Sequence, residues 1–132
     1  PDYSRLAAES FAAITGLDLA YEDMDVDQPA GFESGPTENP NDETVEMDPD
    51  EELAWPDQQK INDWWSRQKS RFNNGGRYLH GAQITREQCI DVLKNGYQRQ
   101  RRAAAMELAI FDRQQPLFNT SATAKRQYQQ LG

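Results

Sequence analysis

The sequence contains one cysteine, Cys89, and one histidine, His80. An internal disulfide is therefore impossible, and a zinc site built from several cysteines is excluded. No apolar run approaches the roughly 20 residues of a membrane-spanning helix. The first residues also lack the charged and apolar regions of a signal peptide. These absences favour a reducing, cytoplasmic compartment and exclude a membrane protein from the expected classes.

Basic side chains are almost missing from the first half of the chain. Residues 1–59 hold 17 acidic side chains and one cation, Arg5, for a formal charge of −16. Residues 60–132 hold 13 Lys or Arg and five acids, for a formal charge of +8. This asymmetry indicates either an acidic arm lying on a basic body of the same chain or an acidic arm that binds a separate basic partner. The sequence leaves both alternatives open.

Residues 1–16 are predicted to form one helix, with Asp2 as the N-cap and Gly16 as the stop. The apolar residues at helical spacing are Tyr3, Leu6, Ala7, Phe11 and Ile14. A helix of this length is marginal on its own in water, so it needs a partner. Because the chain begins at Pro1 rather than Met, we expect a piece of a longer or processed chain. The helix would then be the last one of a preceding helical repeat.

Residues 17–55, the acidic arm, show no sustained helical or strand period. Four prolines and 14 acids favour an extended, mostly irregular segment. Apolar residues recur along the arm and are predicted to pin it to a helical body: Leu17, Leu19, Tyr21, Phe32, Val45, Met47, Leu53 and Trp55. An unattached acidic arm is the alternative.

Residues 56–132 are predicted to form a small domain of three or four helices. An amphipathic helix begins near Asp57, with apolar positions at Ile61, Trp64, Trp65 and Phe72. Residues 77–81 are expected to be short and extended. The predicted fold is all-α: a small helical body, a long acidic arm wrapped on it, and one N-terminal helix left over from a repeat array.

The next helix is predicted to start at Thr85, with Gln88 completing a capping box, and to stop at residues 95–96. Residues 97–112 are predicted to form the central helix. They are apolar from Ala103 to Phe111 except at Glu107, which is typical of a helix packed on several sides. A short last helix is expected from 122 to 131, with Tyr128 and Leu131 facing inward.

The residue chemistry predicts no catalytic, cofactor or metal site. Asp23, Asp25 and Asp27 alternate like the first ligands of a calcium loop. Gln28, however, stands where that loop needs glycine, and Ser34 stands where it needs a bidentate glutamate. The lone histidine has no second ligand residue beside it and no nucleophile motif. We therefore expect a protein that is not an enzyme.

Glu107 is the single charge in the apolar part of the predicted central helix. An unpaired charge in such a place would be costly, so it needs a cation. No basic residue occupies the neighbouring helical positions 103, 104, 110 or 111. We predict a structural ion pair between Glu107 and either Arg71 or Arg77.

A cluster of cations opens the predicted central helix, beside Tyr97. These arginines could contact phosphates while the ring stacks on a base, but an acidic arm would repel nucleic acid. Arg101 falls on the apolar stripe and is expected to be partly buried. A protein partner is therefore favoured over nucleic acid. The candidate partner-binding residues are Asp42, Glu43, Glu46, Asp48, Asp50, Glu51, Glu52, Arg99 and Arg102.

Several segments together resemble one protein family. They are ITGLDL at 14–19, GFESGPT at 31–37, DPDEELAWP at 48–56, WW at 64–65, RF at 71–72, GRYL at 76–79, QRQRRAAAMEL at 98–108 and PLFN at 116–119. Their order resembles the C-terminal portion of an uncharacterised bacterial family with HEAT-like helical repeats, encoded in type VI secretion gene clusters.

The resemblance implies a cytoplasmic accessory or adaptor protein, with a repeat array preceding Pro1, and it supplies no active-site residues. The expected function is a non-enzymatic protein–protein interaction module that serves assembly or cargo handling in a secretion system. The alternative is an immunity-like inhibitor whose acidic arm covers the basic groove of a toxin such as a nuclease. Neither function implies a cofactor.

Overall fold

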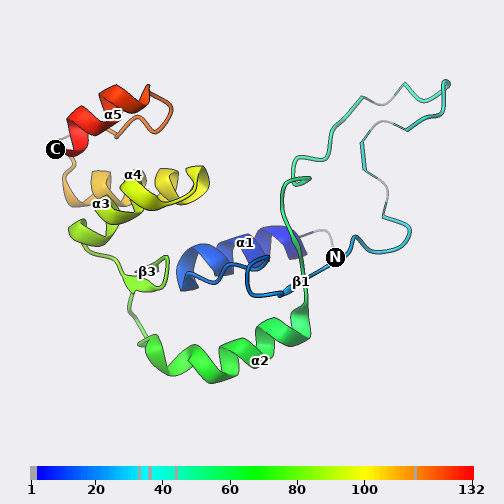
Figure 1. The fold of residues 1–132 in the computed structure, drawn as a ribbon, viewed down its shortest axis with the longest axis horizontal. Helices are drawn as coiled ribbons and strands as arrows, with labels where there is room; N and C mark the ends of the chain where they lie inside the picture. Colours follow the sequence, from blue (N-terminus) through cyan, green and yellow to red (C-terminus); the bar gives the residue numbers. More distant parts are fainter. Residues whose placement is uncertain (1–2, 33, 36, 44, 115) are drawn as a thin grey trace. The chain divides into compact units, whose positions relative to one another are not determined.

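A computed structural model describes residues 3–32, 34–35, 37–43, 45–114 and 116–132. The described part is mostly helical, as expected, but it also contains two small antiparallel sheets (Figure 1). The helices are α1 (Ser4–Thr15), α2 (Gln58–Gln68), α3 (Arg86–Asn95), α4 (Gln98–Phe111) and α5 (Ala124–Leu131), with a 3₁₀ turn at Lys69–Arg71. The strands are β1 (Asp25–Val26), β2 (Trp55–Pro56), β3 (Tyr78–Leu79) and β4 (Ala82–Gln83). The predicted N-cap, Asp2, lies outside the described residues.

The chain forms two compact units. Unit 1 comprises Pro1–Ala12 and Asp18–Ser70, and unit 2 comprises Ala13–Leu17 and Arg71–Gly132. The division therefore runs through the predicted 56–132 domain and places α2 in the same unit as most of the acidic arm. It also assigns the end of α1 to unit 2.

The buried face of α1 differs from the predicted one. Arg5 and Ala8 are buried, and the ring of Phe11 packs edge-on against Trp64 at 5.8 Å between ring centroids. Tyr3 and Leu6, from the predicted apolar face, are exposed, Tyr3 to 77%. The prediction was wrong because it treated Arg5 as a solvated charge, whereas this side chain has partners in the arm.

The predicted helix after residue 55 is present as α2. Its N-cap is Asp57, whose Oδ1 accepts hydrogen bonds from the backbone N–H groups of Gln59 and Lys60 at 3.0 and 3.1 Å. These bonds satisfy two of the free N–H groups at the helix start. Trp64 is buried, whereas Trp65 is more exposed.

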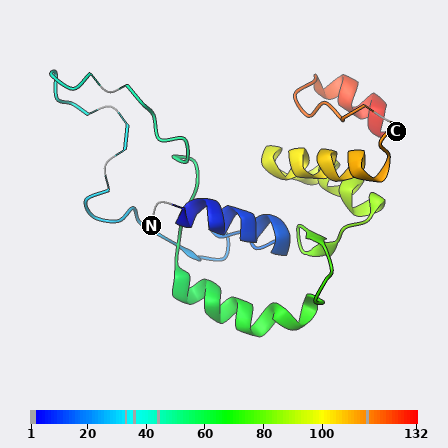
Figure 2. The same cartoon turned by 180° about the vertical axis from the view of Figure 1, so that it is seen from behind.

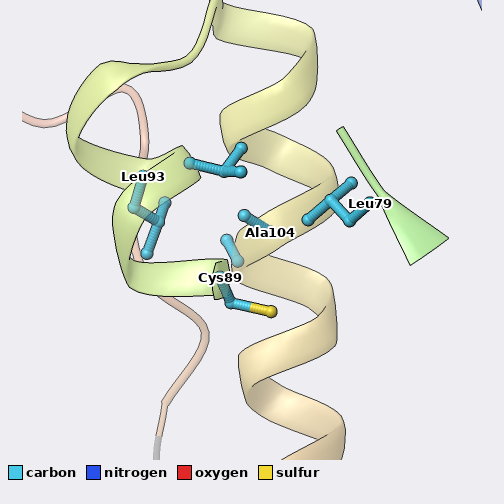
Figure 3. Packing of buried hydrophobic residues seen from close by; sticks show 6 residues of the cluster. Leu79, Cys89, Leu93 and Ala104 are labelled. Carbon is cyan, nitrogen blue, oxygen red and sulfur yellow. The ribbon is translucent and has the colours of Figure 1, made fainter. Parts of the chain in front are cut away.

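The core of unit 2 lies where α3 meets α4, and these two helices lie side by side in both views (Figure 1, Figure 2). Figure 3 shows how the small side chains of α4 allow bulkier residues of α3 and β3 to pack closely. The buried cluster consists of Leu79, Cys89, Val92, Leu93, Ala104 and Ala105. Cys89 is completely buried and acts as a small hydrophobic residue, as predicted.

The start of α3 agrees with the predicted N-cap but not with a reciprocal capping box. Thr85 Oγ1 accepts a hydrogen bond from the Gln88 backbone N–H at 3.1 Å. The Gln88 side chain donates instead to the carbonyl of Leu79 at 3.0 Å. This bond ties α3 to β3, so Gln88 serves the tertiary fold as well as the helix start.

The prediction that residues 97–112 pack on several sides was wrong. α4 buries Ala104 and Ala105 against α3, but Met106 is 62% and Ile110 is 54% exposed. Phe111 is exposed as well. Alanine gives α4 a close contact on one face, and no other described element of unit 2 buries the bulky residues of the opposite face.

The inward position of Tyr128 was also predicted wrongly. Tyr128 of α5 is exposed, whereas Leu131 packs at the edge of the core. Gln127 is the buried residue of α5, and its Nε2 donates to the carbonyls of Thr120 and Ala122. A polar side chain can be buried here because hydrogen bonds replace its contacts with water.

A tight β-hairpin joins β3 to β4, where the sequence predicted only an extended segment. His80 and Gly81 have φ angles of +51° and +81°, as a two-residue hairpin turn of the I′ type requires. Their backbone N–H groups donate to the carbonyls of Ala13 and Ile14 at 2.6 and 3.0 Å. The turn thereby satisfies two carbonyls at the end of α1.

Candidate functional site

The acidic arm is attached to α1 by Arg5. One guanidinium nitrogen of Arg5, Nη1, lies 2.7 Å from Asp48 Oδ2, and Nη2 donates to Asp48 Oδ1 at 3.0 Å. Nη1 also donates to the carbonyl of Asp50 at 2.8 Å. The Arg5 and Asp48 side chains are only 7% and 13% exposed. This two-pronged, charge-assisted pairing fixes both the position and the orientation of the arm at this point.

Two aromatic rings complete the contacts of Arg5. The guanidinium carbon lies 4.4 Å from the ring centroid of Trp55 and 5.2 Å from that of Phe32. The two rings contact each other edge-on at 4.8 Å. Cation–π contacts of this kind add to the ion pair. We call Arg5, Phe32, Asp48, Asp50 and Trp55 the Arg5 anchor.

The electrostatics of the Arg5 anchor favour the charged pair. The hydrogen bond from Arg5 is the main cause that lowers the pKa of Asp48, and the backbone N–H of Asp50 adds to it. The same side-chain bond raises the pKa of Arg5. Both directions reflect the same ion pair, whose two partners are charged at neutral pH.

A second attachment closes the arm near its start. β1 pairs with β2, with Val26 opposite Trp55, and the backbone N–H of Asp57 donates to the carbonyl of Met24 at 2.9 Å. Lys60 Nζ donates to the carbonyl and to the carboxylate of Asp23 at 2.6 and 3.1 Å. The pairing brings residues 26 and 55 together, so the segment between them is a closed loop.

The predicted apolar anchors divide into two groups. Leu17, Leu19 and Leu53 are buried, and Phe32 and Trp55 pack in the Arg5 anchor, so apolar residues do pin the arm at these positions. The anchor is supplied by Arg5 of α1 and not by the predicted body of residues 56–132. The prediction was wrong for Tyr21, Val45 and Met47, which are exposed.

In the arm tip, described at residues 37–43 and 45–47, the hydrogen bonds of Thr37 and Asn41 are local. Thr37 Oγ1 donates to Asp42 Oδ2 at 2.7 Å, and the backbone N–H of Asn41 donates to Asn39 Oδ1 at 3.1 Å. Val45 is 80% exposed. Figure 1 and Figure 2 show this region as a long loop without regular structure. Most of its described side chains are exposed, because short polar turns rather than a core set its path.

The predicted partner-binding acids differ in availability. Asp48 is engaged by Arg5, Asp50 is half-buried, and Asp42 accepts a bond within the arm tip. The exposed acids are Glu43, Glu46, Glu51 and Glu52. Asp48 therefore attaches the arm, and the four exposed acids lie on its surface.

Glu107 and Arg77 lie together in unit 2, where Arg77 Nη2 donates to Glu107 Oε1. Arg71 lies elsewhere, with its guanidinium carbon 6.0 Å from the ring centroid of Phe72. Among the described residues, the other carboxylate oxygen of Glu107 is buried and accepts no hydrogen bond. Burial raises the pKa of the nearby Cys89 thiol, and the charge of Glu107 raises it further.

The arginines at the start of α4 have different surroundings. Arg101 is half-buried, and it donates from Nε to the carbonyl of Leu93 at 2.8 Å and from Nη2 to Gln127 Oε1. It therefore joins α3, α4 and α5. Arg99 and Arg102 are exposed. This pair, rather than Arg101, presents positive charge on the surface of unit 2.

Unit 2 also has a cavity of about 270 Å³ formed by α3, α4, α5 and the segment after α4. Most of the residues that line it are apolar, among them Leu108, Phe118 and Leu131. Arg86 and Asp112 line it as well, with opposite charges. The cavity is open to solvent, and its volume suits one large side chain better than a cofactor.

Sequence reasoning missed Arg5 as the residue that organises the arm. The available signal was its isolation, because it is the only cation among the first 59 residues. A cation surrounded in sequence by so many acids is expected to be paired. The sequence could not show that its partner is 43 residues away.

No protein-family model, curated protein or solved structure matches this chain. Among the described residues, no group of His, Cys, Asp and Glu could hold a metal ion, and no helix is long and apolar enough to cross a membrane.

Proposed function

We propose that this protein is a non-enzymatic protein–protein interaction module whose contact segment is the tip of the acidic arm. The observation that supports this function most directly is a closed loop, fixed at its base by Arg5, whose tip exposes acidic and apolar side chains. The resemblance to the secretion-encoded family gives the context: a cytoplasmic accessory or adaptor protein of a type VI secretion system.

Attachment at the base favours binding by the tip. A loop whose ends are held in place has fewer conformations to lose when it binds, so less binding free energy is spent on ordering. The exposed acids accelerate association with a cationic surface. Val45 and Met47 add apolar surface that a partner can bury. The expected partner surface therefore combines cations with an apolar patch.

The helical-repeat origin of α1 belongs to the same proposal. Leu6 of α1 and Tyr3, which directly precedes α1, leave large apolar side chains exposed. A neighbouring helix of a repeat array would bury such side chains. This is the support that the structure adds to the resemblance.

The test is a pull-down from the native host with the full chain as bait. A variant with Glu43→Lys and Glu46→Lys removes two exposed acids of the tip. A control with Glu22→Lys and Glu87→Lys changes the same charge at exposed positions outside it. We expect baseplate or cargo proteins of the secretion system with the wild type and the control, and at least about tenfold less with the tip variant. Equal recovery by all three would contradict the role of the tip.

The second candidate function is an immunity-like inhibitor, and the 14 acids of the arm favour it, since no Lys or Arg accompanies them. An acidic loop of this kind can cover a groove that binds nucleic acid phosphates. The same pull-down distinguishes the two functions, because an inhibitor would recover a single cognate toxin. Addition of the protein should then block that toxin's activity, whereas the tip variant should not.

A further inference from the structure

One face of α4 combines exposed cations with exposed apolar side chains. Arg102, Met106 and Ile110 follow one another at intervals of four residues, with Arg99 one turn before Arg102. Residues at this spacing share one face of a helix. Ala104 lies on the opposite side of the helix, where it packs on α3. The exposed face is thus a surface stripe that is basic at its start and apolar further along.

The arm tip carries a matching pattern. Glu43, Val45 and Met47 are all exposed and alternate along the chain. Bound as an extended strand, these three residues would lie on the same side, about 6.6–6.8 Å from each other. Residues four apart on a helix are separated by about 6 Å along its axis. The spacing of these three side chains on the arm therefore nearly equals the spacing of the three side chains on α4.

The matching repeats define one register. Glu43 lies opposite Arg102, Val45 opposite Met106 and Met47 opposite Ile110. The arrangement pairs one acid with one cation and two apolar residues with two apolar residues. The reverse direction would place Glu43 against Ile110 and Met47 against Arg102, so charge selects the parallel alignment.

We propose that the arm tip of one molecule binds the α4 stripe of a second copy of this chain. Charge complementarity supports this occupant, because residues 1–59 carry a formal charge of −16 and residues 60–132 carry +8. Two copies related by a two-fold axis make the contact twice, once with each arm. Reciprocal exchange doubles the buried area and pairs the acidic half of each molecule with the basic half of the other. The inference rests on the proposed role of the arm tip as the contact segment, and its tests use the pure protein without any secretion-system partner.

The first experiment measures the molar mass of the full chain by sedimentation equilibrium over a range of concentrations. We expect a dimer at about 0.05 M salt and partial dissociation at about 0.5 M, because salt screens the exposed pairs. Arg102→Glu or Glu43→Arg alone should raise the apparent dissociation constant at least about tenfold. An equimolar mixture of the two variants should recover association, because each supplies the charge that the other has lost.

Lys125→Glu and Glu22→Lys are the matched controls, since both residues are exposed and lie outside the proposed contact. Each should leave the dissociation constant within about threefold of the wild-type value. Circular dichroism of every variant verifies that the helices are retained. A monomer at all concentrations, or equal effects of control and contact variants, would overturn the proposal.

A disulfide experiment distinguishes a second copy from binding within one molecule. Val45→Cys and Met106→Cys are made in separate chains that differ in mass and are then mixed under mild oxidation. We expect the mixed disulfide to exceed either homodisulfide severalfold. The native thiol of Cys89 is buried and does not compete. If a chain with both substitutions instead closes internally while remaining monomeric, the second-copy proposal is rejected.

Discussion

Replacement of Leu93 by alanine should destabilise unit 2 far more than the same replacement at Leu108. Leu93 is completely buried between α3 and α4, where Figure 3 shows it in the core cluster. Leu108 is half-buried and lines the solvent-open cavity. Both substitutions remove the same three carbon atoms. A difference between their effects on the unfolding free energy therefore reflects the surroundings of each leucine.

The magnitude follows from burial. Removal of three carbons from a fully buried leucine costs about 2.4 kcal/mol of transfer free energy, at about 0.8 kcal/mol each. The cavity that is left adds to this, so Leu93→Ala should cost about 3 to 5 kcal/mol. At Leu108, solvent already reaches the neighbouring cavity and less surface is lost from the core. We expect about 1 to 2 kcal/mol there.

Urea unfolding followed by circular dichroism measures both free energies. The three tryptophans, Trp55, Trp64 and Trp65, all lie in unit 1, so fluorescence reports on that unit separately. If Leu108→Ala proves as costly as Leu93→Ala, α4 is packed on both faces and the one-sided packing described above is wrong.

Three further predictions concern single contacts. Arg77→Ala should cost about 1 to 3 kcal/mol of unfolding free energy, because it leaves the carboxylate of Glu107 unpaired. In a double-mutant cycle measured by urea unfolding, the free-energy effects of Arg77→Ala and Glu107→Ala should be non-additive. The effects of Arg71→Ala and Glu107→Ala should be additive. The lowered pKa of Asp48 means that the Arg5 anchor is complete above the ordinary carboxyl pKa of about 4 and is lost as pH falls below it. Tryptophan fluorescence should show this loss, and Asp48→Asn should abolish the transition. Gly81→Ala should destabilise the β3–β4 hairpin by at least about 1 kcal/mol, because φ is +81° and a Cβ atom would lie 2.7 Å from a carbonyl oxygen. Thermal unfolding measures this loss of stability, and a variant as stable as the wild type would refute the turn geometry.

Local signals in the sequence predicted which segments are helical. Thr85 and Asp57 are strong N-cap residues, and both act as N-caps in the structure. The end of α3 at Asn95 was predicted from the following glycine. These signals work because a capping bond joins residues only two or three positions apart, so the information lies within one turn.

The sequence was a poorer guide to which face of a helix is buried. Hydrophobic spacing favoured Tyr3 and Leu6 of α1, yet Arg5 is the residue that is buried there. A charged side chain is buried only when its partners reach it, and Asp48 reaches it through the path of the whole arm. The apolar run of α4 likewise predicted packing on several sides, although alanines supply most of its core contact.

For the candidate site, the sequence could restrict the partner of Glu107 to two arginines but could not choose between them. The choice depends on the hairpin that follows Arg77, and this hairpin has no Asn-Gly signal because His80 occupies the first turn position. In the arm, the sequence separated acids from cations correctly. It could not distinguish Asp48, which attaches the base of the loop, from the acids of the tip, because all of them are Asp or Glu residues of one acidic segment.

The two classes of acid explain how one segment can be both attached and available for binding. The 14 acids of the arm repel one another and disfavour collapse of the tip. Arg5 opposes this repulsion at one place, where Asp48 is 13% exposed and aromatic rings exclude water. Salt screens the exposed acids of the tip strongly and this sheltered pair much less. Higher ionic strength should therefore weaken binding by the tip without releasing the base of the loop. An interaction module with a preformed loop requires this separation.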